Sequence, residues 1–484
     1  MFQFIRTDRL RYSLSPRLTQ ADPKVDRSLR HSVKDAVSHQ VMTGCGEAYF
    51  SAFALFLKAS TAQIAWLVSL PPLLGSIAQL LSAWLGRHPG RRKRIIMTGA
   101  LLQGIAWLPL LSLPLLFPNH AITLLISCVV IYHAMGHFIA PQWSSLMGDL
   151  VPEEQRGRYF AMRTRLASIT AFVSLVCAGL TLHYFHEQGL TAAGFIVIFI
   201  AACIARFKSS YHLSCMHDPP HPTTKWHSRS ASQWITTFRH SPFVRFSMCF
   251  ALLQCAVSIA SPFFTVYMLR DLHYSYLEFM ANTAIVVIVQ FLTLNMWGRW
   301  SDKFGNRFVL IITGIAIPIL PLLWFMSADY VWLLFAQAMG GFVWAGFSLC
   351  ASNYVYDLVP SGKRATYVAL HNVLTCIAVF FGAMLGGYLG MTLPTHYSWL
   401  GSDLQVTSAL LVVFLISALA RGLMVAMLLP QLREARRVTP ITVPRLLFRS
   451  VQVSKIMDSL PVWARRRTKT PSQQENSLPI QAEQ

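Results

Sequence analysis

Long apolar runs, separated by short polar stretches, follow one another along most of the chain. A helix that crosses the hydrocarbon core of a bilayer needs about 20 mostly apolar residues, and twelve segments satisfy that requirement. The runs are continuous rather than alternating, so they predict helices and not the strands of a membrane barrel. The predicted helices are Ala36–Leu57, Ala62–Leu85, Ile95–Phe117, Ile122–Leu150, Tyr159–Tyr184, Leu190–Phe207, Phe246–Leu269, Leu277–Trp297, Phe308–Met326, Val331–Leu358, Thr366–Met391 and Thr407–Leu429.

A polar, proline-bearing stretch over residues 214–243 divides these helices into two sets of six. The motif Asp149-Leu-Val-Pro-Glu-Glu-Gln-Arg156 recurs as Asp357-Leu-Val-Pro-Ser-Gly-Lys-Arg364, after the fourth helix of each half. Two halves repeated in the same orientation are typical of one class of transporter. We therefore expect an all-α integral membrane protein with bundles over residues 36–213 and 244–430. A basic N-terminal segment (residues 1–35) and a partly disordered tail (residues 431–484) should flank them.

Composition narrows the class of protein. Of the 484 residues, 54% are hydrophobic and only 13% are charged. Soluble domains carry roughly a quarter charged residues, so a water-soluble globule is excluded. The recurring apolar runs also exclude a disordered chain. The nine cysteines form no CxxC pair, and the spacing of cysteines and histidines indicates neither a disulfide framework nor a metal site.

The basic residues predict the orientation of the chain. Lys and Arg number 41 against 20 acidic residues, and nearly all of them lie in the two terminal segments and in every second loop. Cytoplasmic loops retain such residues, so both termini should be cytoplasmic, and a nucleic-acid partner is not expected. The outer loops contain no N-x-S/T sequon, which favours a bacterial inner membrane. The basic tail is expected to contact anionic lipids of the inner leaflet.

One loop between the eighth and ninth helices carries a specific pattern. It reads Gly298-Arg-Trp-Ser-Asp302-Lys303-Phe-Gly305-Asn-Arg307. This loop resembles the G-x-x-x-D-[RK]-x-G-x-[RK] motif of the major facilitator superfamily, and the resemblance covers roughly Ala36 to Leu429. It implies that Asp302 accepts hydrogen bonds from the N-terminus of the fifth helix when the cytoplasmic side is closed. A helix N-terminus favours an anion there.

The equivalent loop of the first half matches this motif only in part. Gly90 and Arg92 keep their places, but an arginine replaces the aspartate. The basic cluster that includes Arg91 and Arg92 could pair with Asp149. In the second half Asp357 could pair likewise with Lys303 or Arg307. A solvated basic loop that only sets the topology is the alternative.

Glu47 is the only acidic residue near the middle of a predicted helix. An ionised side chain at mid-bilayer costs at least ~2.5–3.5 kcal/mol on insertion scales, so few persist without a role. A low dielectric favours the neutral carboxyl, which would allow Glu47 to exchange a proton during transport. The alternatives are a site for a cationic or hydroxyl-bearing substrate, a structural ion pair, and a permanently protonated hydrogen-bond donor. Arg165 is the candidate counter-ion for Glu47 or for an anionic substrate, whereas Arg163 is expected to be structural.

Further polar residues in the predicted spans are candidates for lining a substrate cavity. His133 and His137 share one helix face, which suits a proton relay, a metal or an ordinary interhelical hydrogen bond. Four glycines on the eleventh helix, Gly382, Gly386, Gly387 and Gly390, are expected to allow close helix packing. The remaining cavity candidates are Tyr49, Gln142, Trp143, Gln254, Gln290, Gln337, Trp344, His371 and Asn372.

These observations predict a secondary active transporter that moves a small solute by alternating access, with protons as the candidate coupling ion. A membrane receptor or assembly factor with the same fold is the alternative. Uptake of a solute into proteoliposomes would separate the two. No nucleotide-binding pattern is present, and no enzyme activity, cofactor or metal is expected. The chain is expected to act as a monomer.

Overall fold

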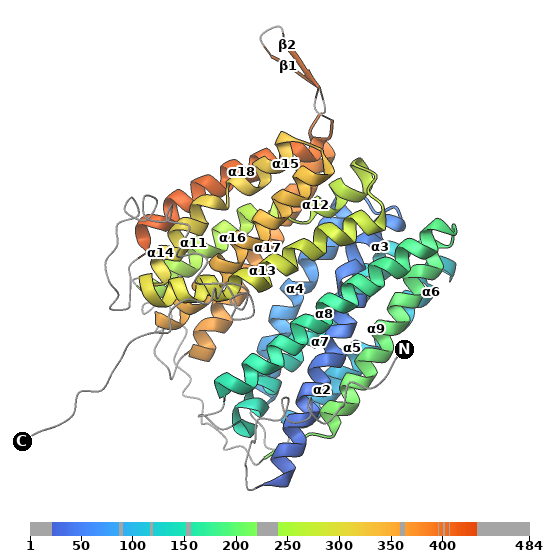
Figure 1. Ribbon diagram of the computed structural model, residues 1–484, viewed down its shortest axis with the longest axis vertical. Helices are drawn as coiled ribbons and strands as arrows, with labels where there is room; N and C mark the ends of the chain where they lie inside the picture. Colours follow the sequence, from blue (N-terminus) through green and yellow to red (C-terminus); the bar gives the residue numbers. More distant parts are fainter. Residues whose placement is uncertain are drawn as a thin grey trace, which may run out of the picture.

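The computed structural model describes residues 22–86, 91–116, 120–151, 156–219, 241–358, 364–394, 396–399, 402–405 and 407–432. The helices form two bundles (Figure 1). In the first they are α2 (Pro23–Cys45), η1 (Glu47–Tyr49), α3 (Phe50–Phe56), α4 (Thr61–Leu85), α5 (Arg92–Ile105), α6 (Leu108–Leu116), α7 (Ala121–Leu150), α8 (Arg156–Glu187) and α9 (Thr191–Ser214). In the second they are α11 (Pro242–Ser258), α12 (Phe263–Val266), η3 (Tyr267–Asp271), α13 (Tyr276–Phe304), α14 (Asn306–Ala316), α15 (Ile319–Met326), α16 (Tyr330–Asp357), α17 (Arg364–Thr392), α18 (Ala409–Leu428) and η5 (Leu429–Gln431).

Eleven helical spans among the described residues are long and apolar enough to cross a membrane. The first crossing, made of α2 beyond its first three turns, η1 and α3, is the polar exception and completes the twelve. Many large apolar side chains face outward from the bundles, including Leu80, Ile204, Leu292, Phe381 and Leu419. Such a surface would promote aggregation in water but suits contact with lipid. The prediction of an all-helical, twelve-span membrane fold is therefore confirmed.

Two local features differ from the expected helices. The first helix begins at Pro23, well before Ala36, because Asp22 caps it and accepts a hydrogen bond from the Lys24 amide. Proline at the first helical position also favours this start. Between α17 and α18 the chain forms a hairpin of β1 (His396–Trp399) and β2 (Ser402–Gln405), in which His396 pairs with Gln405. The hairpin projects beyond the bundles (Figure 1).

The bundles converge near α3 and α12 and diverge toward the ends where α2 begins and α18 terminates (Figure 1). We call the latter the terminal side. The contacts between bundles lie toward the opposite side, where α17 packs on α4 and α13 on α8. There the Arg270 guanidinium donates to the Thr61 hydroxyl at 3.1 Å, and the rings of Trp66 and Phe380 are 5.5 Å apart. The structure is thus closed on the opposite side and splayed on the terminal side.

The glycines of α17 allow these close approaches, as expected. A Cβ atom on Gly387 would lie 2.7 Å from the Ala65 side chain of α4. A Cβ on Gly382 or Gly386 would overlap backbone atoms of α11 or the residue that follows it. Only glycine lets the helix backbones approach this closely.

Candidate functional site

The first crossing is interrupted beside Glu47. Helix α2 ends at Cys45, and Gly46 adopts φ −114° and ψ −69° before the short η1 turn begins. A Cβ atom on Gly46 would overlap the Trp107 indole, so the chain passes this point only with glycine. The interruption places the Glu47 carboxylate at the start of a new turn, within the first bundle.

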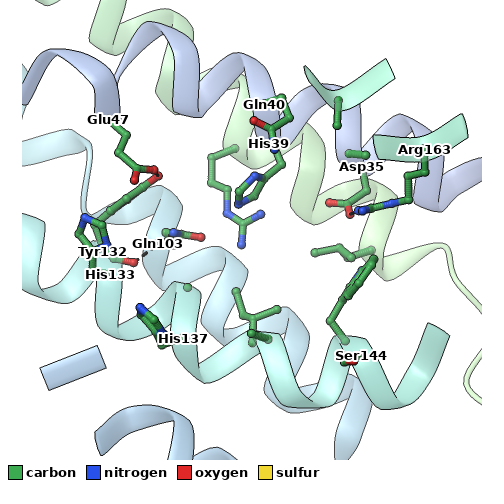
Figure 2. Close-up of a pocket in the computed structure, with 18 residues that line it drawn as sticks. Asp35, His39, Gln40, Glu47, Gln103, Tyr132, His133, His137, Ser144 and Arg163 are labelled. Carbon is green, nitrogen blue, oxygen red and sulfur yellow. Dashed lines mark hydrogen bonds and ion pairs between the residues drawn. The ribbon is translucent and has the colours of Figure 1, made fainter. Parts of the chain in front are cut away.

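Glu47 is held by a tyrosine from the fourth crossing. The Tyr132 hydroxyl donates to Glu47 Oε2 at 2.8 Å (Figure 2). The rings of Phe50 and Trp107 pack edge-on against the Tyr132 ring and fix its position. Gln103 Nε2 donates to the Tyr132 carbonyl at 3.1 Å and ties α5 to α7 at the same level. The carboxylate is therefore oriented by a rigid aromatic cluster.

A second acidic residue, Asp35, lies nearer the terminal side in a network with two arginines. The Ser209 hydroxyl donates to Asp35 Oδ1 at 2.7 Å, and Arg163 Nη2 approaches Asp35 Oδ2 at 3.5 Å. Arg206 Nη1 donates to the Ser209 hydroxyl at 2.7 Å. Arg163 also lies over the Trp143 ring, 4.3 Å from its centroid, a cation–π contact. Asp35 and Arg163 point toward one another at one end of the site (Figure 2).

A cavity of about 620 Å³ connects the two acidic residues. They are twelve residues apart on the first crossing, or roughly 18 Å at 1.5 Å per residue. All of the lining belongs to the first bundle, from α2, η1, α5, α7, α8 and α9. Its ionisable members, besides Tyr132, are Asp35, His39, Glu47, His133, His137, Arg163 and Arg206. No group of three or more His, Cys, Asp or Glu residues in the described part of the chain is arranged to hold a metal ion.

A smaller cavity of about 230 Å³ lies in the second bundle. Its lining is aromatic and neutral-polar, and includes Phe250, Gln254, Trp344, His371 and Asn372. His371 is positioned by the Ser247 hydroxyl, 3.1 Å from its Nδ1 atom. The two bundles thus differ in chemistry, since only the cavity of the first carries acidic residues and arginines.

The structure divides the predicted cavity residues into three groups. Glu47, His133, His137 and Trp143 line the large cavity, and four other candidates line the small one. The remaining five candidates, Tyr49, Gln142, Arg165, Gln290 and Gln337, line neither.

The structure does not place Arg165, the predicted counter-ion, in the cavity that holds Glu47. Arg165 is exposed, and Arg163 lines the cavity in its place. Tyr49 and Gln142 are buried and serve helix packing instead. The Tyr49 hydroxyl donates to the Leu175 carbonyl at 2.7 Å, and Gln142 Nε2 donates to the Ser82 carbonyl at 2.8 Å. Gln290 and Gln337 are half-buried.

Several lining residues escape sequence reasoning. Asp35 directly precedes the apolar run of the first predicted helix, and Arg206 is the penultimate residue of the sixth, so both are taken for loop charges. Tyr132, His39 and Gln103 are polar residues within apolar runs, and nothing in their spacing distinguishes them. A charged residue at the very end of an apolar run is the one sequence signal that could have identified Asp35 and Arg206.

The loops on the terminal side differ between the halves. Arg92 is buried and donates to Asp149 at 2.5 Å, as expected, and also to Asp218 beyond α9. In the second half Asn306 Nδ2 donates to Asp357 Oδ2 at 2.8 Å. Gly305 adopts φ +87°, a conformation that favours glycine, where α13 turns into α14.

The other residues of the predicted gating loops are mostly on the surface. Gly298 is half-buried, and the exposed members of these loops are Arg91, Asp302, Lys303 and Arg307. Within the described part of the chain, Asp302 makes no hydrogen bond or ion pair. Arg156 and Arg364 begin α8 and α17, and Gly90 lies outside the described residues. Among the described residues of α8, none forms the expected contact with Asp302 in this splayed conformation.

Comparison with known proteins defines the class. The sequence profile described as "MFS_1 like family" matches residues 42–400, most of the chain. The chain belongs to this family of the major facilitator superfamily, and it is a multi-pass integral membrane protein.

Two curated relatives illustrate how distant the sequence similarity is. Organic cation/carnitine transporter 7 of Arabidopsis thaliana is 27% identical over 132 residues, 27% of this chain and 26% of that protein. The uncharacterized MFS-type transporter MJ1317 of Methanocaldococcus jannaschii is 27% identical over 176 residues, 34% of this chain and 44% of that protein. The chain therefore spans less than half the length of these relatives.

Solved structures match over nearly their full length. A bacterial homologue of the iron transporter ferroportin, in an inward-facing state, gives a TM-score of 0.65 at 16% identity, covering 84% of this chain and 98% of that one. A D-xylose-proton symporter gives 0.62 at 14% identity, covering 86% and 99%. The nucleoside transporter NupG gives 0.60 at 13% identity, covering 85% and 99%. At these identities the likeness shows the fold alone.

Proposed function

We propose that this protein is a secondary active transporter that moves a small solute by alternating access. The observation that carries the proposal is the cavity in the first bundle, which holds two acidic residues and two arginines in a membrane-embedded fold. Intramembrane charges are costly and mark solute or proton pathways. The asymmetric closure of the bundles supports the same function, because a transporter exposes its site to one side at a time.

The terminal side is the cytoplasmic side in this proposal. Nearly all of the 41 Lys and Arg residues lie in the segments and loops of that side, and such residues stay cytoplasmic during insertion. The conformation is then inward-open, with residues 36–213 and 244–430 as the two moving halves. We place the protein in a bacterial inner membrane, as a monomer whose basic tail contacts anionic lipids. The tail lies outside the described residues.

Glu47 is the proton-carrying group in this proposal. The carboxylate is fixed by Tyr132 and lies in a cavity that three histidines also line. A carboxyl in a low-dielectric site can alternate between charged and neutral forms when its surroundings change. Besides Tyr132, the ionisable and amide groups that share its cavity are Asp35, His39 and Gln40 of α2, Gln103 of α5, His133 and His137 of α7, Arg163 of α8 and Arg206 of α9.

The test separates coupling from binding. Solutes are first screened for their ability to stabilise the purified protein against heat, because a ligand that binds the folded state raises its stability. The best solute is then used in proteoliposomes with Glu47→Gln, which mimics the protonated form. We expect uphill uptake driven by a pH gradient to be lost while exchange of labelled for unlabelled solute persists. Unchanged uphill uptake would refute the role of Glu47, and absence of any uptake by the wild type would refute transport.

A further inference from the structure

Among the described arginines, Arg206 and Arg421 are each at most 2% exposed, and their surroundings differ. Arg421 on α18 is 2% exposed and donates to the Ser417 hydroxyl and to the carbonyls of Ile317 and Val257. One acceptor on α18 itself and two backbone carbonyls on neighbouring segments satisfy it as a structural group. Arg206 on α9 is 1% exposed, yet its guanidinium makes one hydrogen bond within the described part of the chain, to Ser209.

Arg206 has unused hydrogen-bond donors, and its side chain lines the large cavity. A guanidinium carries five N–H donors. The Nε atom of Arg206 is buried and has no partner among the described residues, and the side chain lines the cavity. A buried donor without an acceptor costs about 1–3 kcal/mol, so structures rarely retain one without a use. An acceptor supplied from outside the protein would recover that energy.

The net charge of the cavity indicates that the missing hydrogen-bond acceptor is an anion. Asp35 contacts Arg163 directly and reaches Arg206 through Ser209, so one carboxylate is shared between two guanidinium groups. When Glu47 carries a proton and the histidines are neutral, the cavity therefore has a net charge of +1. Low-dielectric surroundings strengthen the attraction of such a site for an anion.

We propose that this cavity binds an organic monocarboxylate, whose carboxylate accepts hydrogen bonds from Arg206 while Glu47 carries a proton. This inference rests on the proposed role of Glu47 and adds the substrate class. A phosphate monoester carries a charge of about −1.5 to −2 at neutral pH and would overcompensate the site. A cation would face two guanidinium groups with only one ionised carboxylate. A monocarboxylate matches the excess charge.

The stoichiometry follows from the same balance. One proton on Glu47 and one anion on Arg206 cross together, so transport moves no net charge. Uptake should respond to a pH gradient and be insensitive to the membrane potential. Release on the inner side is favoured when Glu47 loses its proton, because the new negative charge cancels the excess positive charge of the cavity.

The first experiment tests whether binding requires a negatively charged ligand. The purified full-length protein is heated with benzoate, octanoate or lactate and, in parallel, with the matching amides benzamide, octanamide and lactamide. We expect at least one carboxylate to raise the thermal midpoint and its amide to have little effect. Failure of all three carboxylates, or equal shifts from acid and amide, would overturn the proposal.

The second experiment assigns the charge recognition to Arg206. Arg206→Gln should weaken binding of the active carboxylate about tenfold or more, and Arg206→Lys, which retains the charge, should weaken it less. Arg165→Gln removes an exposed arginine from the neighbouring helix α8 and should leave the affinity unchanged. If Arg206→Gln does not fold, the lysine variant alone decides the question. Wild-type affinity in a folded Arg206 variant would refute the site.

A third measurement separates this inference from the role of Glu47. Carboxylate affinity is compared between about pH 5.5 and about pH 8, a range in which an exposed carboxylic acid stays ionised. Glu47→Gln should bind the carboxylate equally well at both values, whereas the wild type should weaken toward high pH. Carboxylate binding that depends on Arg206 but not on Glu47 would uphold the substrate class and refute the coupling. Coupling through Glu47 with a neutral solute would do the reverse.

Discussion

The hydroxyl of Tyr132 lies 2.8 Å from the carboxylate of Glu47, and this contact joins the broken first crossing to α7. Tyr132 is buried, and its position is fixed by aromatic packing rather than by the carboxylate alone. The geometry of the Glu47 carboxyl therefore depends on a neighbour whose own position is set by packing.

Tyr132→Phe should impair transport without unfolding the protein. The variant keeps the ring contacts with Phe50 and Trp107 and removes only the donor to Glu47, a hydrogen bond worth about 1.5–3 kcal/mol when one partner is charged. We expect uphill uptake in proteoliposomes to fall about tenfold, with a smaller effect on solute exchange. Tyr159→Phe, which removes the hydroxyl that donates to the Leu29 carbonyl at 3.1 Å, is the matched control. Equal losses in both variants would mean that Tyr132 only supports packing.

Asp302→Asn should slow transport and leave stability unchanged. The carboxylate is exposed in the splayed conformation, so its loss costs the observed state little. In the closed state it is expected to bind the positive end of the fifth crossing, where an amide would bind more weakly by about 0.3–1 kcal/mol. Initial uptake rates and thermal midpoints are compared with those of Glu187→Gln, an exposed acidic residue at the opposite end of α8. Wild-type rates in a correctly inserted Asp302→Asn would contradict the gating role.

Gly387→Leu should shift the protein away from the conformation described here. The added side chain would collide with Ala65 where α17 meets α4, on the side that is closed. Gly340→Leu places the same side chain on α16 at a glycine with open space and serves as control. Spin labels on cysteines introduced at Glu187 and Ala328, in a background lacking the native cysteines, report the separation of the bundles on that side. The label distance should lengthen in Gly387→Leu alone.

The sequence predicts the helices well because a continuous apolar run that crosses a bilayer must satisfy its backbone hydrogen bonds internally, which a helix does. The first crossing is the exception, since Asp35 and the polar residues before it look like a solvated segment. They form part of α2, where Ser209 and Arg163 satisfy Asp35 from other helices and Arg206 in turn donates to Ser209.

The site was predicted less well than the fold. Glu47 and the histidine pair are recognisable in the sequence because polar residues at mid-span are rare. The residues that surround them in the cavity, such as Tyr132 and Arg206, carry no comparable signal. Residues two apart on a helix point about 200° apart, so Arg163 and Arg165 cannot both face the cavity. Which of the two faces the cavity depends on how α8 packs against α2, and that packing cannot be read from the sequence.

The stability of the terminal side should depend on pH through His31. Its Nδ1 atom lies 3.2 Å from Nδ1 of His212 on α9, a contact that requires one of these two nitrogens to accept. Burial, followed by the positive charges of Lys34, Arg27 and Arg30, lowers the pKa of His31 below its ordinary value of 6.5. Lys208 also lies close to this histidine pair, on the side of His212. The folded protein therefore binds this proton less readily than the unfolded chain does.

The sign of the effect follows from that difference in proton binding. Unfolding takes up a proton once the pH falls below about 6.5, so the contribution of His31 to stability is complete above that value and declines as the pH falls toward the lowered pKa. The thermal midpoint should fall between about pH 7.5 and about pH 5.5, and His31→Asn should reduce that fall because asparagine does not titrate. His120→Asn, which changes an exposed histidine at the start of α7, should keep the wild-type slope. The same slope in all three proteins would show that protonation of His31 does not govern the packing of α2 on α9.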